Sequence, residues 1–141
     1  MYSRLSQKLA NEDGINSLRI RFRYSTDIEE SILDILSGIE FLTQEEGIAS
    51  IVLVGHFFGG AVVISAASIT SENIVKAVVT LVTQSYKTEG VFRLKEGSCS
   101  ILLIHGNNDE ILSPYCSHYV YNNAHEPKKS VLYDNSGYGL D

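Results

Sequence analysis

A run of branched apolar residues ends at a glycine and is followed, after a few residues, by a second apolar run. Residues 51–68 read IVLVGHFFGGAVVISAAS, with Gly55 near the end of the first run and Gly60 at the start of the second. Valine and isoleucine dominate the first run, which favours a buried strand, while alanine-rich sequence favours a helix in the second. The stretch therefore predicts a strand, a very sharp turn and a helix.

Strand-like and helix-like segments alternate along the rest of the chain. Alternation of this kind indicates βαβ units, and hence a parallel sheet with helices on both faces. We expect an α/β fold with a sheet of about five strands, forming one domain over residues 1–141. Residues 84–97 read as a loop or a weak helix. Helices are expected at 2–11, 27–46, 58–69 and 113–124, and strands at 15–24, 50–56, 75–82, 99–106 and 128–134.

Residues 15–24, INSLRIRFRY, carry the clearest alternation in the chain. Leucine, isoleucine and phenylalanine alternate with Arg19, Arg21 and Arg23, which predicts a strand with one buried face. Thr26 and Glu29 then form a capping-box pattern for the following helix. The three arginines are expected to pair with that acidic helix, and the alternative is that they bind an anion.

Composition excludes several classes of protein. The net charge is −6 with no dominant basic cluster, so we expect no nucleic-acid partner. No apolar run approaches the ~20 residues that span a bilayer, and the first residues lack an apolar signal core. We therefore expect a cytoplasmic protein without a membrane partner. Its two cysteines are expected to be reduced, and no cofactor or metal is expected because the four histidines, His56, His105, His118 and His125, are scattered.

Three motifs, in order, resemble the α/β-hydrolase family. GHFFGG at 55–60 resembles the G-x-S-x-G-G nucleophile elbow. LLIHGNNDEILSP at 102–114 resembles the segment that presents the acid of the triad. SVLYDNSGYGLD at 130–141 resembles the last strand and the G-x-G-H-G-L turn that carries the general base. The resemblance covers the whole chain and is closest to the small, lidless dienelactone-hydrolase and peptidase-like members.

Carried over to this sequence, the resemblance places the acid at Asp109 and one oxyanion N–H at Phe58. It also places Phe57 at the nucleophile position and Tyr138 at the base position. Phenylalanine has no lone pair to attack a carbonyl, and a tyrosine with a pKa near 10 is a poor general base. The family strand that precedes the first helix, with its His-Gly loop, has no counterpart, so this chain resembles an N-terminally shortened member with a degenerate triad.

The leading hypothesis is a catalytically inactive protein, either a pseudoenzyme or a decayed serine hydrolase, whose candidate ligand is a small acyl or ester-like molecule. The alternative is a carboxylesterase or peptidase-like serine hydrolase whose missing site elements come from an absent segment or a variant position. A third reading is a structural protein that assembles through a strand edge, and we expect a homo-oligomer. Two weaker alternatives are Cys116 as a surrogate nucleophile and an anion at the Gly59 and Gly60 N–H groups.

Two geometric expectations follow from the resemblance. Phe57 should have a positive φ, because the nucleophile of the family lies on a strained turn. Tyr138 should donate a hydrogen bond to Asp109, as the family's imidazole does, and its ring should pack against Phe57.

Overall fold

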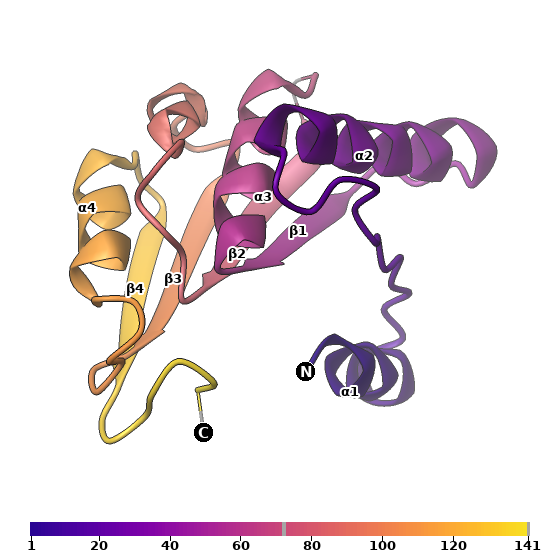
Figure 1. Cartoon of the computed structure of the whole chain (residues 1–141). Helices are drawn as coiled ribbons and strands as arrows, with labels where there is room; N and C mark the ends of the chain where they lie inside the picture. Colours follow the sequence, from indigo (N-terminus) through magenta and orange to yellow (C-terminus); the bar gives the residue numbers. More distant parts are fainter. Residues whose placement is uncertain (72, 141) are drawn as a thin grey trace.

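Four parallel strands form the sheet of this protein, in the order β1-β2-β3-β4 (Figure 1). The structure, a computed structural model, describes residues 1–71 and 73–140. Every neighbouring pair in the sheet is parallel, which confirms the α/β class and the parallel topology expected from the sequence. The strands are β1 (Ile51–His56), β2 (Val75–Leu81), β3 (Ser100–Gly106) and β4 (Lys128–Tyr133).

Helices connect the strands and cover one face of the sheet, where α2, α3 and α4 lie; α1 lies apart, beyond the β1 edge (Figure 1). The expectation of helices on both faces is therefore wrong for the described residues: the strand order runs in one direction, so right-handed connections all pass over the same face. Short π-helical turns extend α1 and α2, and a 3₁₀ turn lies in the region expected to be a loop or weak helix. The helices are α1 (Tyr2–Lys8), η1 (Leu9–Asp13), α2 (Ile28–Glu40), η2 (Phe41–Glu45), α3 (Phe58–Ile69), η3 (Glu89–Arg93) and α4 (Tyr115–Asn123). No helix of the described residues has the length and apolar character to cross a membrane.

The predicted strand at 15–24 is not formed. Residues 14–22 have no regular secondary structure, and Arg23 and Tyr24 lie in a bend. The apolar side chains of Leu18 and Ile20 instead pack against Gly38 of α2. A Cβ on Gly38 would overlap the Ile20 side chain. A strand needs a neighbour that accepts and donates backbone hydrogen bonds, and no strand of the described chain adjoins this segment. The sheet therefore has four strands where about five were expected.

The expected capping box is also replaced. Asp27, not Thr26, is the N-cap of α2, and its carboxylate accepts a hydrogen bond of 3.0 Å from the backbone N–H of Glu30. Aspartate and threonine both favour this position, and the carboxylate in addition places a negative charge at the helix N-terminus, where the macrodipole stabilises it.

The core lies between the sheet and its covering helices, and α3 is its centre. Val62, Ile64 and Ala66 of α3 are fully buried, as are Val78 of β2 and Leu103 of β3. α3 is buried on most sides because it packs against β1, β2, α2 and η3. This packing fixes the start of α3 against the end of β1, which is the turn that the sequence marks as unusual.

Candidate functional site

The turn between β1 and α3 has the strained backbone expected for a nucleophile elbow. Phe57, its central residue, has φ 54° and ψ −114°, so the positive φ expected at this position is confirmed. A bulky residue in this region costs of order 1–3 kcal/mol and persists only where the surroundings hold it. Here the Phe57 N–H donates to Leu81 O at 2.9 Å and the Gly60 N–H donates to Phe57 O at 3.0 Å.

Glycines make the turn sterically feasible. A Cβ on Gly55 would overlap the carbonyl of Gly59, and a Cβ on Gly60 would overlap the Thr83 side chain. The strand and the helix therefore approach each other more closely than any side chain at these two positions would allow. The residue that follows β2, the fully buried Val82, also has a positive φ, of 52°, and lies next to the turn.

The acid position is held by its own loop. Asp109 Oδ1 accepts hydrogen bonds from the N–H groups of Ile111 and Leu112, both at 2.8 Å. The side chain is fully buried, and its other oxygen, Oδ2, has no hydrogen-bond partner among the described residues. His105 Nε2 lies 3.4 Å from Oδ2 but donates instead to Leu112 O, at 2.9 Å. Asp109 thus presents one buried, unsatisfied carboxylate oxygen.

The His105 ring is itself fixed from both sides. Its Nδ1 lies 2.6 Å from the hydroxyl of Ser117 in α4, and both residues are almost completely buried. Because Leu112 O can only accept, Nε2 carries the proton and Nδ1 accepts from Ser117. This serine, histidine and aspartate have the residue types of a hydrolytic triad, but their burial makes them a structural network that holds the acid loop.

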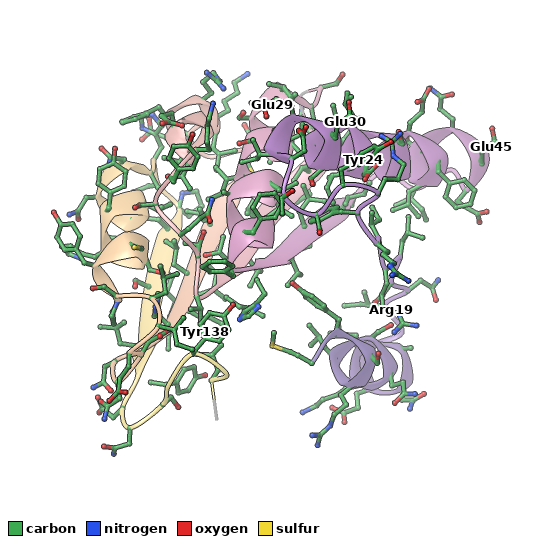
Figure 2. The ribbon with its side chains drawn as sticks, viewed as in Figure 1. Arg19, Tyr24, Glu29, Glu30, Glu45 and Tyr138 are labelled. Carbon is green, nitrogen blue, oxygen red and sulfur yellow. The ribbon has the colours of Figure 1, made fainter. Side chains whose placement is uncertain are left out.

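The base position lies on a turn that is fastened to the acid loop. The N–H of Asn108 donates to Ser136 O at 3.0 Å, and the Asn107 side chain donates to Asp134 at 2.6 Å. A Cβ on Gly106 would overlap the carbonyl of Ser136, so the turn also packs tightly on the end of β3. Tyr138 is thereby held at the carboxyl end of the sheet, below the start of α3 (Figure 2).

Phe57, Phe58 and Tyr138 lie close together, but the expected hydrogen bond from Tyr138 to Asp109 is absent. The Tyr138 ring lies 5.8 Å from the Phe57 ring, centroid to centroid, so the packing of these two rings is confirmed. Phe58 follows directly as the first residue of α3. The hydrogen bond expected from Tyr138 to Asp109 is not formed, since Oδ2 of Asp109 is unpartnered. The Tyr138 ring turns instead toward the two aromatic side chains at the end of β1.

Sequence reasoning missed the histidine that completes this aromatic cluster and the tyrosine beside it. The His56 ring lies 5.0 Å from the Tyr138 ring, centroid to centroid, and Tyr2 of α1 lies near the His56 backbone. Burial raises the pKa of Tyr2, and the nearby His56 backbone only partly offsets the rise. The position of His56 beside the turn was a usable signal, whereas nothing in the sequence placed Tyr2 here.

The other candidate residues lie elsewhere. Cys116 on α4 contacts the Ser85 hydroxyl at 3.7 Å and has no hydrogen bond to a histidine among the described residues. Arg23 pairs with Asp34 and Glu30 of α2, at 2.5 and 3.2 Å, as expected for the acidic helix, whereas Arg19 bonds to Ser3. A cavity of about 380 Å³ lies at the amino ends of β2 and β3, lined by Phe92, Arg93 and Cys99 among others, and includes none of the elbow, acid or base positions.

No protein-family model and no curated protein matches the sequence. Solved structures do match. The esterase domain of a Rhodothermus marinus protein is 22% identical to this chain in sequence, with a TM-score of 0.65. The match covers 78% of this chain and 60% of the chain of that esterase domain. Est1E from Butyrivibrio proteoclasticus is 16% identical to this chain, with a TM-score of 0.70. This match covers 83% of this chain and 64% of the Est1E chain.

A Xanthomonas campestris serine hydrolase without a lid is 14% identical with a TM-score of 0.64, over 92% of this chain and 55% of its own. The chain therefore spans less than two thirds of the length of each of these three structures. At such low identity the likeness concerns the fold and not the activity. The chain has the fold of the lidless α/β serine hydrolases, built here on four parallel strands.

Proposed function

We propose that this chain is a non-catalytic protein on a hydrolase fold, and that it does not cleave ester or amide bonds. The observation that carries the proposal is the occupation of the elbow by Phe57, whose ring packs on Tyr138. Covalent acyl transfer needs a hydroxyl or thiol at that turn and a base beside it that accepts its proton. Neither a phenyl ring nor a phenol supplies this pair of functions at neutral pH.

The loss of both groups leaves too little of the machinery for turnover. Removal of the serine or the histidine of such a triad lowers kcat by about a million-fold, and what remains depends on the oxyanion hole. In this chain Asp109 retains a buried carboxylate oxygen that has no hydrogen-bond partner among the described residues, as expected of an acid that has lost its base. We therefore infer that the fold is retained for binding, with a small acyl or ester-like molecule as the candidate ligand.

A second candidate is a serine hydrolase that receives its missing parts from another segment. Two observations favour it: the elbow keeps its strained backbone at Phe57, and the N–H of Phe58 lies at the first position of α3 without a backbone acceptor among the described residues. Both features are of use in catalysis, and both are also explained by the packing of strand and helix around the turn.

Restoring the side chains distinguishes the two candidates. The wild-type chain, Phe57→Ser, Tyr138→His and the double variant are assayed with short-chain aryl esters under identical conditions. The proposal predicts no hydrolysis above background for the wild type and for either single variant, and a gain only when both changes are combined. Activity of the wild type that a serine-directed phosphonate abolishes would contradict the proposal.

A further inference from the structure

A cavity of about 380 Å³ opens at the amino ends of β2 and β3, at the opposite end of the sheet from the elbow. The end of α3 and η3, which Figure 1 shows side by side, form two of its walls. Small-molecule sites have volumes of roughly 300–1,000 Å³, so the space suits a compact ligand. The elbow, acid and base positions do not line it, and a ligand here would therefore occupy a separate site.

Hydrogen bonds hold the walls of this cavity in place. Nε2 of His125 lies 3.2 Å from Phe92 O, and because a carbonyl only accepts, Nε2 carries the proton and donates. The loop before β3 is closed by two bonds to Lys95 O, from the N–H groups of Ser98 at 3.1 Å and Cys99 at 3.3 Å. The cavity is therefore formed before any ligand binds.

Part of the cavity lining is apolar. Val75 and Leu94 line it and are buried, and Ala67 of α3 adds a methyl group. Burial raises the pKa of the Cys99 thiol, so this group stays uncharged at neutral pH. The Phe92 ring is 51% exposed and offers a flat apolar surface. The apolar body of a ligand, such as an aromatic ring, therefore finds matching contacts here.

The charged lining of the cavity is mostly cationic. Arg93 and Lys95 line it together with a single carboxylate of the described chain, that of Glu96. Arg93 has no hydrogen bond or ion pair among the described residues, although the chain carries 17 acidic residues against 11 basic ones. A guanidinium binds carboxylate groups in a planar, bidentate geometry. An unpaired arginine beside an apolar lining therefore selects a ligand that is both anionic and apolar.

We propose that this cavity binds a small carboxylate with a compact apolar body. Arg93 binds the carboxylate group, while the Phe92 ring and the apolar lining contact the body of the ligand. An inorganic anion meets only the first requirement, and an uncharged aromatic molecule meets only the second. The proposal does not depend on whether the chain is catalytic, because Phe57 lies at the other end of the sheet.

Titration of the intact chain with benzoate, followed by NMR of the backbone amides, is the direct test. Benzoate should bind with a Kd of about 1 mM or below and shift the amides of Arg93, Cys99 and His125. Benzamide, which has the same shape without the charge, should bind at least about tenfold more weakly. Equal binding of the two, or no saturable shift up to about 10 mM benzoate, would overturn the proposal. So would shifts centred on His56 and Tyr138, which would place the ligand at the elbow.

Matched substitutions test the role of Arg93. Arg93→Gln removes the guanidinium from the cavity, and Arg21→Gln changes the net charge equally at an exposed residue that does not line it. The first should weaken benzoate binding at least about tenfold and the second should leave it unchanged. Both side chains are exposed, so both variants should fold, which circular dichroism checks. Equal effects of the two variants, or none from Arg93→Gln, would overturn the proposal.

The two cysteines give a readout on the wild-type chain. Cys99 lines the cavity, whereas Cys116 lies on α4 and does not, and both are partly exposed. Saturating benzoate should slow the alkylation of Cys99 and leave the rate at Cys116 unchanged, as measured by mass spectrometry of the two peptides. Equal slowing at both cysteines, or at neither, would overturn the proposal.

Discussion

Phe57 holds a backbone conformation that bulky residues rarely adopt. Its φ of 54° is unfavourable for a bulky residue, yet Gly55 and Gly60 let the strand and the helix close tightly around it. The ring is only partly buried and packs edge-on against Tyr138, at 5.8 Å. The turn is thus held by its surroundings and not by any preference of residue 57.

Comparison of two truncations measures the strain at this turn. Phe57→Ala and Phe57→Gly both remove the ring and its packing, but only glycine tolerates the positive φ without cost. We expect the glycine variant to be more stable than the alanine variant by about 1–3 kcal/mol in urea unfolding. Equal stabilities of the two variants would mean that the turn is not strained in solution.

Asp109 provides a second residue-scale prediction. Asp109→Ala removes two hydrogen bonds to the N–H groups of Ile111 and Leu112 and should destabilise the protein by about 1–3 kcal/mol. Asp109→Asn keeps an oxygen for those bonds and replaces the unpartnered Oδ2 with an uncharged group, so its loss should be smaller. Urea unfolding of both variants checks this order, and an asparagine variant less stable than the alanine variant would refute it.

At the scale of elements, the segments that were predicted well are those whose own residues decide their structure. The apolar runs at 51–56, 75–81 and 100–106 are strands, and the helix expected at 58–69 has those bounds. The turn at Phe57 was also predicted from the sequence, because the neighbouring glycines specify it. Residues 15–24 had the clearest alternation and still form no strand, since alternation specifies a face and not a hydrogen-bonding partner.

The sequence did not predict which of two similar residues caps a helix, or which of two nearby groups a side chain contacts. Thr26 and Asp27 both suit an N-cap, and the structure uses Asp27. The Tyr138 ring could reach either the acid loop or the end of β1, and it packs on His56 and Phe57. Each outcome depends on loop paths set by distant contacts, such as the bond between Asn108 and Ser136. Local motifs carry no information about those paths.

The ion pair between the N-terminal segment and α2 gives a pH-dependent prediction. Hydrogen bonds from the backbone N–H and the guanidinium of Arg23 lower the pKa of Asp34 below its ordinary 3.8. A carboxylate with a lowered pKa in the folded state stabilises the protein above the unfolded pKa, and this stabilisation is lost as the pH falls through the folded value. Asp34→Asn should therefore be less stable than wild type at pH 6.

The difference between Asp34→Asn and wild type should shrink below pH 3.8, because the carboxylate of the unfolded chain takes up a proton there before that of the folded chain does. Urea unfolding across this range measures the trend. Glu30→Gln is the matched control, because Glu30 contacts the same guanidinium at 3.2 Å but is more exposed, and its effect should be smaller. A constant difference at all pH values would mean that Asp34 acts through packing and not through charge.

At the scale of the whole molecule, the fold brings the elbow, acid and base positions to one end of the sheet, and our proposal concerns the side chains that occupy them. The end of β1, the loop after β3 and the turn after β4 meet at the carboxyl end of the sheet, where α/β proteins bind ligands. The helices and sheet that bring them together depend on core residues such as Ile64 and Leu103 and not on the site. Stability of the scaffold is therefore separable from activity.

Labelling with a fluorophosphonate, followed by intact-mass measurement, tests the central claim most directly. The reagent forms a stable adduct only with a serine whose hydroxyl is activated by a neighbouring base. The wild-type chain should show no mass increase after prolonged incubation, whereas the double variant Phe57→Ser with Tyr138→His, the matched control, should gain one adduct on residue 57. A stoichiometric adduct on any serine of the wild-type chain would contradict the proposal that the chain is non-catalytic.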